Sequence, residues 1–269
     1  MLRRLISALP APFIRFVGRL QFRIPFLRPL IERAAGNLAE GEGTIRHGVG
    51  AGLRFNATGG NVGYLLGTTE PEEQAALAGF LKPGAVFYDI GANIGFYSTI
   101  AARLVGETGH VYAFEPFPIS ATAVQTNASL NGFSNVTVVV AAVTNEQGVV
   151  SLAISDASRK HRVATTGENG NIDVRSIRMD SYVTDENLRP PDVVMIDVEG
   201  AEVDVLKGML ETIRNHRPTI MCEVHWILDE LYDFCRTELN PLGYELRTLT
   251  GEPLPTTQAV RYHALLIPS

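Results

Sequence analysis

Two carboxylates in this sequence lie where they could bind a charged, nucleotide-like ligand. Asp89 lies at the end of a short apolar segment with the composition of a buried strand, and Glu115 follows the next such segment. After the first segment come three turn-forming residues, Gly91, Asn93 and Gly95, and then an apolar helical pattern. A strand, a glycine-bearing turn and a helix start form the usual ligand site of an open α/β sheet. Glycines suit such a turn because they let the backbone come close to a ligand.

The order of these residues favours a cationic ligand. A dinucleotide site reads G-x-G-x-x-G and places a pyrophosphate on helix N–H groups, whereas this turn reads D-x-G-x-N-x-G. The Asp89 carboxylate would repel a pyrophosphate, but it suits the ammonium and sulfonium groups of S-adenosylmethionine. Glu115 lies about twenty residues beyond the turn, the separation expected of a carboxylate that binds ribose hydroxyls. The alternative is a plain strand–helix turn with a chance acidic residue.

Two later apolar segments end in residues that could do acid–base chemistry. These residues are Asp197, Glu199, Glu223 and His225. The carboxyl ends of parallel strands share one edge of a sheet, so we expect all four to converge on the same cleft as Asp89. His225 is the natural general base near neutral pH, and a neighbouring carboxylate would orient its ring. The alternative is a histidine exposed at a strand end.

The same four residues offer oxygen and nitrogen ligands for a divalent metal. Their spacing carries no metal-binding signature, so we expect a site without metal and keep a metal site as the alternative. Glu202 is expected to begin the next helix, near its positive end. The other histidines, including His161 and His263, fit no pattern and are expected at the surface or in packing contacts.

The elements that must position these residues alternate between strands and helices. Strands are expected over residues 110–114, 136–140, 192–197, 218–224, 242–247 and 261–267, and helices over about 94–105, 118–131, 201–214 and 228–239. Near-continuous apolar strands predict a parallel sheet with helices on both faces. The loop 250–257 is too short for a helical crossover, so the last strand should be antiparallel. The polar stretch 155–171 is either a mobile loop over the site or an ordinary connection.

The chain begins with residues 1–67, a basic segment and a glycine-rich segment, ahead of the predicted catalytic domain, residues 68–269. Six arginines precede the first acidic residue, Glu32. Residues 1–31 could lie on an anionic membrane surface, dock on their own domain or on the second subunit of a homodimer, or form a transit peptide. The glycine-rich residues 36–67 predict a small β-hairpin region.

Composition sets broad limits on the protein class. The 269 residues are 45% hydrophobic, enough for one sizeable core, and the net charge of −6 gives no general attraction for nucleic acid. Cys222 and Cys235 show no metal or redox spacing, so we expect buried free thiols in a reducing compartment. No apolar run reaches the roughly 18 residues of a membrane span. We therefore expect a cytoplasmic protein, peripheral to the membrane if its basic segment binds there.

The motifs together resemble those of FkbM-family S-adenosylmethionine-dependent methyltransferases. The resemblance covers roughly residues 67–267 and rests on F-Y-D-I-G-A-N-I-G-F-Y-S (87–98), A-F-E-P (113–116), N-A-S-L-N-G (127–132), R-M-D-S-Y (178–182), I-D-V-E-G-A-E-V-D-V-L-K-G (196–208) and C-E-V-H (222–225). It implies a Rossmann-like class I methyltransferase fold, with a seven-stranded, mostly parallel sheet and an antiparallel last strand. It also implies methyl transfer mostly to hydroxyl oxygens of sugars, polyketides and similar small molecules.

The resemblance also implies roles for individual residues. The methionine part of the cofactor would be held by Asp89, Gly91, Asn93 and Gly95, the ribose by Glu115, and the adenine by Ala141 and Ala142. The acceptor side would be lined by Asp197, which also borders the cofactor, and by Glu199, Glu223 and His225. The family commonly has a polar residue before the Ala-Ala pair, where this chain has Val140.

The sequence thus predicts an S-adenosylmethionine-dependent O-methyltransferase with a small-molecule or glycan acceptor. One alternative is a nucleotide-dependent oxidoreductase on a similar sheet, which Asp89 and the missing G-x-G-x-x-G pattern disfavour. Another is a cofactor-binding or membrane-attached scaffold protein without catalysis, which the cluster of acidic residues and histidine disfavours.

Overall fold

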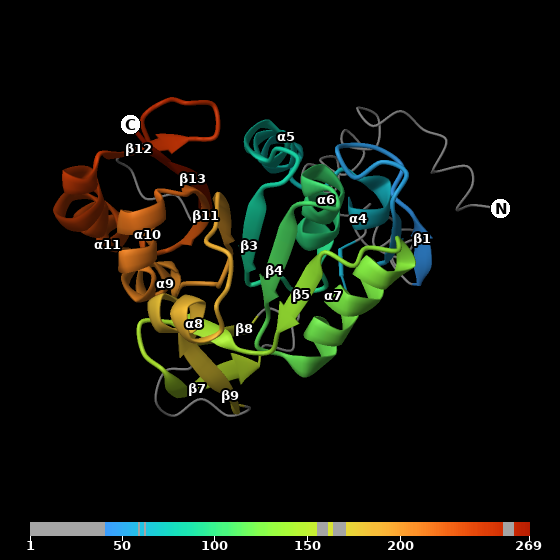
Figure 1. The fold of residues 1–269 in the computed structure, drawn as a ribbon, viewed down its shortest axis with the longest axis horizontal. Coiled ribbons are helices and arrows are strands. Elements are labelled where there is room, and N and C mark those ends of the chain that lie inside the picture. Colours follow the sequence, from blue (N-terminus) through green and yellow to red (C-terminus); the bar gives the residue numbers. More distant parts are fainter. Residues whose placement is uncertain (1–40, 59, 62, 155–160, 164–170, 255–260) are drawn as a thin grey trace, which may run out of the picture.

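A computed structural model describes residues 41–58, 60–61, 63–154, 161–163, 171–254 and 261–269. A seven-stranded sheet forms its centre, in the strand order β12-β13-β11-β10-β3-β4-β5 (Figure 1). The strands are β3 (Val86–Ile90), β4 (His110–Phe114), β5 (Val136–Val139), β10 (Val193–Ile196), β11 (Thr219–His225), β12 (Tyr244–Thr248) and β13 (Arg261–Pro268). The basic segment 1–31 and most of the loop 155–171 lie outside the described residues.

The directions of the strands match the expected class I arrangement. β3 pairs in parallel with β4 and β10, β4 with β5, and β10 with β11. β13 pairs antiparallel with both β11 and β12. The expected antiparallel last strand is therefore confirmed, and it is inserted between two strands that precede it in the chain.

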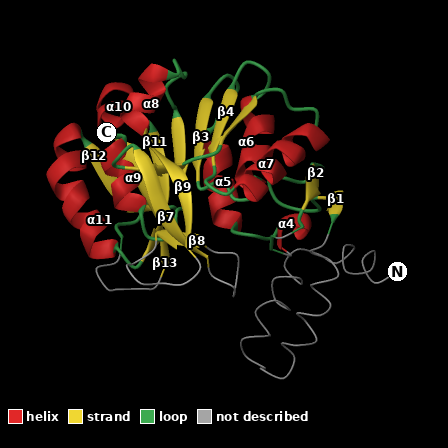
Figure 2. Ribbon diagram, turned by 90° about the horizontal axis from the view of Figure 1, so that it is seen from below, coloured by secondary structure: helices red, strands yellow, loops and turns green. Residues whose placement is uncertain are grey.

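Helices cover both faces of this sheet (Figure 2). One face carries α5 (Pro71–Phe80), α6 (Phe96–Val105) and α7 (Pro118–Leu130). The other face carries α8 (Met179–Asp185), α9 (Glu202–Gly208), α10 (Leu210–His216) and α11 (Leu228–Phe234). The single helix expected over 201–214 is wrong in detail, because it is divided at the fully buried Met209. The helix expected over 228–239 continues from α11 as a π-helix, Cys235–Leu239.

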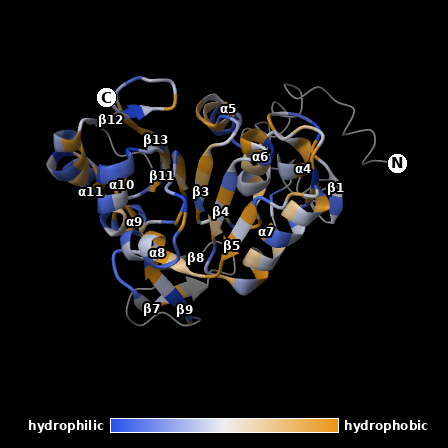
Figure 3. Ribbon diagram, in the orientation of Figure 1, coloured by the Kyte–Doolittle hydropathy of each residue, from blue (hydrophilic) through white to orange (hydrophobic). Residues whose placement is uncertain are grey.

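Successive side chains of the central strands enter two different hydrophobic clusters. In β3, Tyr88 and Ile90 belong to the cluster on the α9–α11 side, whereas Phe87 belongs to the cluster beneath α6. Figure 3 shows the hydrophobic residues gathered on these strands. Burial on both faces explains why the strands are apolar almost throughout their length, the pattern from which the sheet was predicted.

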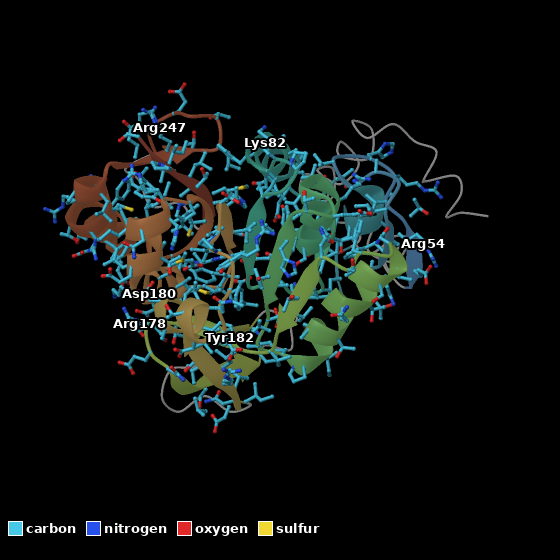
Figure 4. All side chains as sticks on the ribbon, in the orientation of Figure 1. Arg54, Lys82, Arg178, Asp180, Tyr182 and Arg247 are labelled. Atoms are coloured by element: carbon cyan, nitrogen blue, oxygen red, sulfur yellow. The ribbon has the colours of Figure 1, made fainter. Side chains whose placement is uncertain are left out.

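The glycine-rich segment forms the expected hairpin. β1 (Glu42–Thr44) pairs antiparallel with β2 (Arg54–Asn56), and the Arg54 side chain pairs with Glu42 at the surface (Figure 4). Two asparagines of α7 hold the other side of β2. Asn127 accepts the backbone N–H of Asn56 at 2.7 Å, and Asn131 both accepts from and donates to the Arg54 backbone, at 2.9 and 2.8 Å. The hairpin is thus fixed to a helix of the main sheet.

A second sheet, in the order β6-β9-β7-β8, was not predicted. Its strands are β6 (Ala142–Thr144), β7 (Gly148–Ile154), β8 (His161–Val163) and β9 (Asn171–Arg178). α8 follows directly and is held by Asp180, which accepts the backbone N–H of Thr212 at 2.8 Å and pairs with Arg178 at 3.0 Å (Figure 4). The described part of the 155–171 segment is β8, which pairs with β7.

Two compositional expectations can be checked in the same structure. Cys222 and Cys235 are both buried free thiols, as predicted. In the described parts of the chain, every helix is too short or too polar to cross a lipid bilayer.

Candidate active site

A pocket of about 440 Å³ lies at the carboxyl ends of β3, β4 and β10. This volume falls in the range of about 300–1,000 Å³ that is usual for small-ligand sites. Six residues predicted to bind the cofactor contribute to its wall: Asp89, Gly91, Asn93, Glu115, Ala142 and Asp197. The unpredicted second sheet also borders this pocket, through β6 and Leu152 of β7.

The turn after β3 needs glycine for a specific reason. Gly91 has a φ of 88°, and a Cβ atom at this position would lie 1.9 Å from the carbonyl oxygen of Asp197. Any side chain would therefore force the β3 turn away from the end of β10. Gly95 has a different role, because it precedes α6 with a φ of 82° and packs against Val124. It supports the turn but does not belong to the pocket wall.

Glu115 joins the loops at the ends of β3 and β4. One carboxylate oxygen accepts the backbone N–H of Asn93 at 2.8 Å, and the other accepts that of Phe117 at 3.0 Å. The side chain is 5% exposed, and burial raises the pKa of Glu115 to about 7. Each carboxylate oxygen has a second lone pair, so the group can still accept hydroxyl groups from a ligand.

Asp89 is a buried acid on the pocket wall. It accepts the hydroxyl of Ser98 on α6, and it is 3% exposed. Burial raises the pKa of Asp89 to about 6. A buried carboxylate with a raised pKa gains from a cationic partner, because the cation offsets the cost of ionising it there. Asp89 and Glu115 together suit a ligand with a positive group and neighbouring hydroxyls.

The four residues predicted for the acceptor side come together around the His225 ring. Its Nε2 atom lies 3.3 Å from Glu223 Oε1, 3.5 Å from Glu199 Oε2 and 4.0 Å from Asp197 Oδ1. Its Nδ1 atom lies 2.7 Å from Glu202 Oε1. The ring is therefore surrounded by four carboxylates from the loop and helix after β10 and from β11 itself.

The four predicted residues differ in their access to the pocket. Asp197 and Glu199 belong to the pocket wall, but Glu223 and His225 do not. Glu223 is 1% exposed and His225 is 2% exposed. His225 therefore lies behind the two carboxylates that a ligand would meet, and its assignment as a base in contact with the acceptor stays a prediction.

Glu202 is the functional residue that the sequence analysis placed without recognising its partner. α9 does begin at Glu202, as expected. Its carboxylate is fully buried, however, and pairs with His225 while accepting the backbone N–H of Gly200 at 3.0 Å. β10 and β11 are adjacent in the sheet, so an acid at the start of the helix after β10 lies close to the end of β11. That adjacency is the signal that could have revealed the pair.

Competing effects act on the pKa of His225. Burial lowers the pKa, but the hydrogen bond to Glu202 and the charges of Glu199 and Asp197 raise it by more, so the net change is upward. The ring thus has a higher affinity for a positive charge on Nε2 than an ordinary histidine.

A further acidic group borders the cluster. The Tyr97 hydroxyl donates to Glu70 at 2.8 Å, and both residues line the pocket. His263 of β13 is the register partner of Glu223 and lies 3.0 Å from Glu73. The expectation that His263 has only a surface or packing role is therefore corrected, because it belongs to a partly buried ion pair.

The backbone around the pocket adopts conformations that side chains rarely favour. Among the described non-glycine residues with positive φ, four lie at or beside the site: Glu70, Asn93, Glu199 and Trp226. Such residues cluster at binding and catalytic sites, where the surrounding structure maintains the strain. Trp226 follows His225 directly, and its side chain is unusually exposed for tryptophan, at 64%.

Comparison with families and relatives gives consistent results. The family model described as "Methyltransferase FkbM domain" matches residues 89–246. The chain is 30% identical to hexuronic acid methyltransferase AglP of Haloferax volcanii, over 52% of this chain and 56% of that protein. It is 27% identical to 31-O-demethyl-FK506 methyltransferase FkbM of Streptomyces tacrolimicus, over 54% of this chain and 67% of that protein. The chain thus matches little more than half the length of the archaeal relative.

A solved structure supports the fold independently. A Clostridium thermocellum protein described as an rRNA methylase matches with a TM-score of 0.50 at 13% identity, over 73% of this chain and 95% of that chain. At this identity the likeness concerns the fold alone.

Proposed function

The chain belongs to the FkbM methyltransferase family, and from this we propose that it transfers the methyl group of S-adenosylmethionine to a hydroxyl oxygen of a sugar or similar small acceptor. The observation that carries the proposal is the pocket wall, which combines Asp89 and Glu115 with Asp197 and Glu199. The first pair suits the cofactor, and the second pair suits a hydroxyl group.

The residues present fit S-adenosylmethionine, the cofactor that belongs to this family. The buried carboxylate of Asp89 offers a negative partner to its positively charged methionine part. The Glu115 carboxylate, held by two backbone N–H groups, is placed to accept ribose hydroxyls. Ala142 leaves room beside β6 for a flat ring such as adenine.

Catalysis by this chain consists mainly of alignment and proton removal. When bound, the cofactor supplies a methyl group whose bond to sulfur breaks, with the electron pair left on sulfur, as the acceptor oxygen bonds to the methyl carbon. The acceptor hydroxyl must also lose its proton. Asp197 and Glu199 are the carboxylates at the pocket wall that hold this hydroxyl and receive the proton, and His225 supports them from behind at 4.0 and 3.5 Å.

Trp226 supports a sugar as the acceptor. Its indole ring is exposed at the end of β11, 5.5 Å from the His225 ring, in a left-handed backbone conformation. An exposed indole in a strained conformation offers a flat apolar face, which suits the C–H face of a sugar ring. The relative from Haloferax volcanii is named for a hexuronic acid, so a uronic acid glycan is the first acceptor to test.

Replacing Trp226 with alanine should raise the KM for a glycan acceptor about tenfold, equivalent to ~1.4 kcal/mol. The reason is loss of the indole face, while the cofactor pocket stays intact. Steady-state kinetics with varied acceptor would measure this change, and calorimetry should give an unaltered cofactor affinity. Trp226→Phe keeps an aromatic ring and should recover most of the lost affinity. Equal KM values for all three proteins would remove Trp226 from the acceptor site.

Cofactor affinity should increase with pH between about 5 and 7.5. Burial raises the pKa of Asp89 to about 6 and that of Glu115 to about 7, and a cationic ligand binds the ionised carboxylate better. Asp89 alone is only about one-tenth ionised at pH 5, which predicts roughly tenfold weaker binding than at pH 7.5. Calorimetric titration of S-adenosylmethionine across this range would measure the trend, and Asp89→Asn should flatten it.

The ligand-free protein should show the opposite trend in stability. Both carboxyls have a higher pKa when folded than the ordinary values of 3.8 and 4.5. The folded state therefore holds its protons more tightly, so this stability contribution is complete below about pH 4 and is lost as pH rises through 6 to 7. Cofactor affinity that is constant from pH 5 to 7.5 would contradict the placement of these acids against a cation.

The function itself can be tested with labelled cofactor. Purified protein should move a labelled methyl group from S-adenosylmethionine onto uronic acid oligosaccharides, and alkaline stability of the product would distinguish an ether from an ester. S-adenosylhomocysteine should bind in calorimetry, with NADH as the comparison ligand. Absence of S-adenosylhomocysteine binding, or preference for NADH, would overturn the proposal.

A further inference from the structure

We propose that Asp197, Glu223 and His225 bind one divalent cation of the Mg²⁺ or Mn²⁺ type, behind and between the carboxylates of the pocket wall. Each of the three offers one ligand atom, and these atoms lie within 4.8 Å of one another. The set joins the end of β10 to the end of β11, two neighbouring strands. The sequence spacing alone did not reveal this grouping.

The orientation of the His225 ring supports a metal ligand. Its Nδ1 atom is engaged by Glu202 at 2.7 Å, which leaves Nε2 facing Asp197 and Glu223. His225 is 98% buried, as its exposed fraction is 2%, and Nε2 is without a hydrogen-bond partner among the described residues. Histidines that bind metals characteristically donate their other ring N–H to a carboxylate, which fixes the tautomer and orients the ring. Glu202 fulfils that role here.

The distances are close to those of an octahedral site. With metal–ligand bonds of about 2.1 Å, neighbouring ligand atoms lie about 3.0 Å apart and opposite ones about 4.2 Å apart. The His225 Nε2 atom is 3.3 Å from Glu223 Oε1 and 4.0 Å from Asp197 Oδ1. Small adjustments of these side chains would therefore complete three ligand positions. The Glu199 carboxylate, 3.5 Å from the same nitrogen, is available as a fourth.

The chemistry of the ligands selects the type of cation. Two or three carboxylates with one imidazole are hard, mostly oxygen ligands, which suit Mg²⁺ and Mn²⁺ better than copper or zinc. The clustered negative charge also needs compensation, because Glu223 and Glu202 are almost completely buried. A proton on His225 would supply one positive charge, whereas a divalent cation would supply two.

A second group, formed by Glu70, Glu223 and His263, also places its ligand atoms within 4.8 Å. His263 already pairs with Glu73 at 3.0 Å, and Glu70 accepts the Tyr97 hydroxyl. Binding a metal there would require breaking both contacts. The group around His225 keeps its supporting hydrogen bond when it binds a metal, so it is the better site.

A cation at this position would explain how a weakly acidic hydroxyl reacts. The role, unlike the binding itself, rests on the proposed function. Water has a pKa of 15.7, which a bound metal can lower to about 7, and a sugar hydroxyl in contact with the ion would be activated in the same way. Carboxylates with pKa values near 4 are weak bases for such a group. Asp197 links the ion to the pocket, because it belongs to both.

Manganese binding can be measured without any assay of activity. The full-length protein would be treated with EDTA, dialysed and titrated with Mn²⁺, with the electron paramagnetic resonance signal of free Mn²⁺ as the readout. We expect one Mn²⁺ per chain, at least tenfold weaker in Glu223→Gln and in His225→Gln. Glu230→Gln makes the same chemical change on the exposed face of α11 and should bind Mn²⁺ as the wild type does.

Melting curves would show whether each variant is folded. Asp197 is 35% exposed, so Asp197→Asn serves as the ligand variant if the buried substitutions unfold the chain. Absence of Mn²⁺ binding by the wild type at millimolar concentration, or equal binding by wild type and folded ligand variants, would overturn the site. Calorimetry with S-adenosylhomocysteine on the same samples tests the proposed function separately, because cofactor binding does not depend on the metal site.

Discussion

Replacing Asp89 with asparagine should weaken S-adenosylmethionine binding by about 10²-fold or more without unfolding the protein. Removing one partner of a buried, hydrogen-bonded charge pair costs about 2–5 kcal/mol, and each 1.4 kcal/mol is tenfold in affinity. Asparagine has the size of aspartate and can still accept the Ser98 hydroxyl, so the loss should concern the charge alone. Calorimetric titration at pH 7.5 would measure it.

The same substitution should act in the opposite direction on the empty protein. Burial raises the pKa of Asp89 to about 6, so at pH 7.5 the folded chain carries an ionised group in an unfavourable place. Asparagine removes that cost, and the melting temperature without ligand should stay the same or increase. Asp233→Asn, on the exposed side of α11, should change neither quantity. Wild-type cofactor affinity in folded Asp89→Asn would refute the assignment.

Replacing Gly91 with alanine should destabilise the fold by about 2–5 kcal/mol, since two penalties act together. A left-handed backbone costs a residue with a Cβ about 1–2 kcal/mol, and forcing atoms into a filled space typically costs a further 1–3 kcal/mol. The φ of Gly91 is 88°, and the new Cβ would start 1.9 Å from the Asp197 carbonyl oxygen. Urea denaturation would measure the loss.

Gly79 provides the matched control. It lies in α5, and a Cβ built there meets no described atom within 4 Å. Gly79→Ala should therefore stabilise the protein by roughly 0.5–1 kcal/mol, because alanine loses less conformational entropy in a helix. If Gly91→Ala were as stable as the wild type, the close contact between the β3 turn and the end of β10 would be wrong.

The parts of the fold that the sequence predicted are those with a strong, regular pattern. Strands β4 and β10 were found because buried strands are continuous runs of apolar residues. The site followed from topology, because the ends of parallel strands share one edge. That rule brought Asp197, Glu199, Glu223 and His225 together on paper, and the structure places them around one ring.

The parts that were missed depend on contacts between distant segments. The strands of the second sheet are short, with three residues in β6, and they alternate between buried and exposed positions next to polar loops. The partner of Glu202 could not be read from periodicity, because helix starts often carry acids for electrostatic reasons. The absence of Gly95, Glu223 and His225 from the pocket wall depends on packing depth, which a one-dimensional pattern does not record.

The insertion of β13 between β11 and β12 has a consequence for the order of assembly during synthesis. A ribosome makes β12 before β13, yet β12 joins the sheet only through β13. Until β13 emerges, the nascent chain has an open sheet edge at β11 and an unattached β12, and such edges favour wrong pairings. Release from the ribosome and completion of the sheet are thus coupled. Chains cut short before residue 261 should be recognised by chaperones and proteases as unfinished.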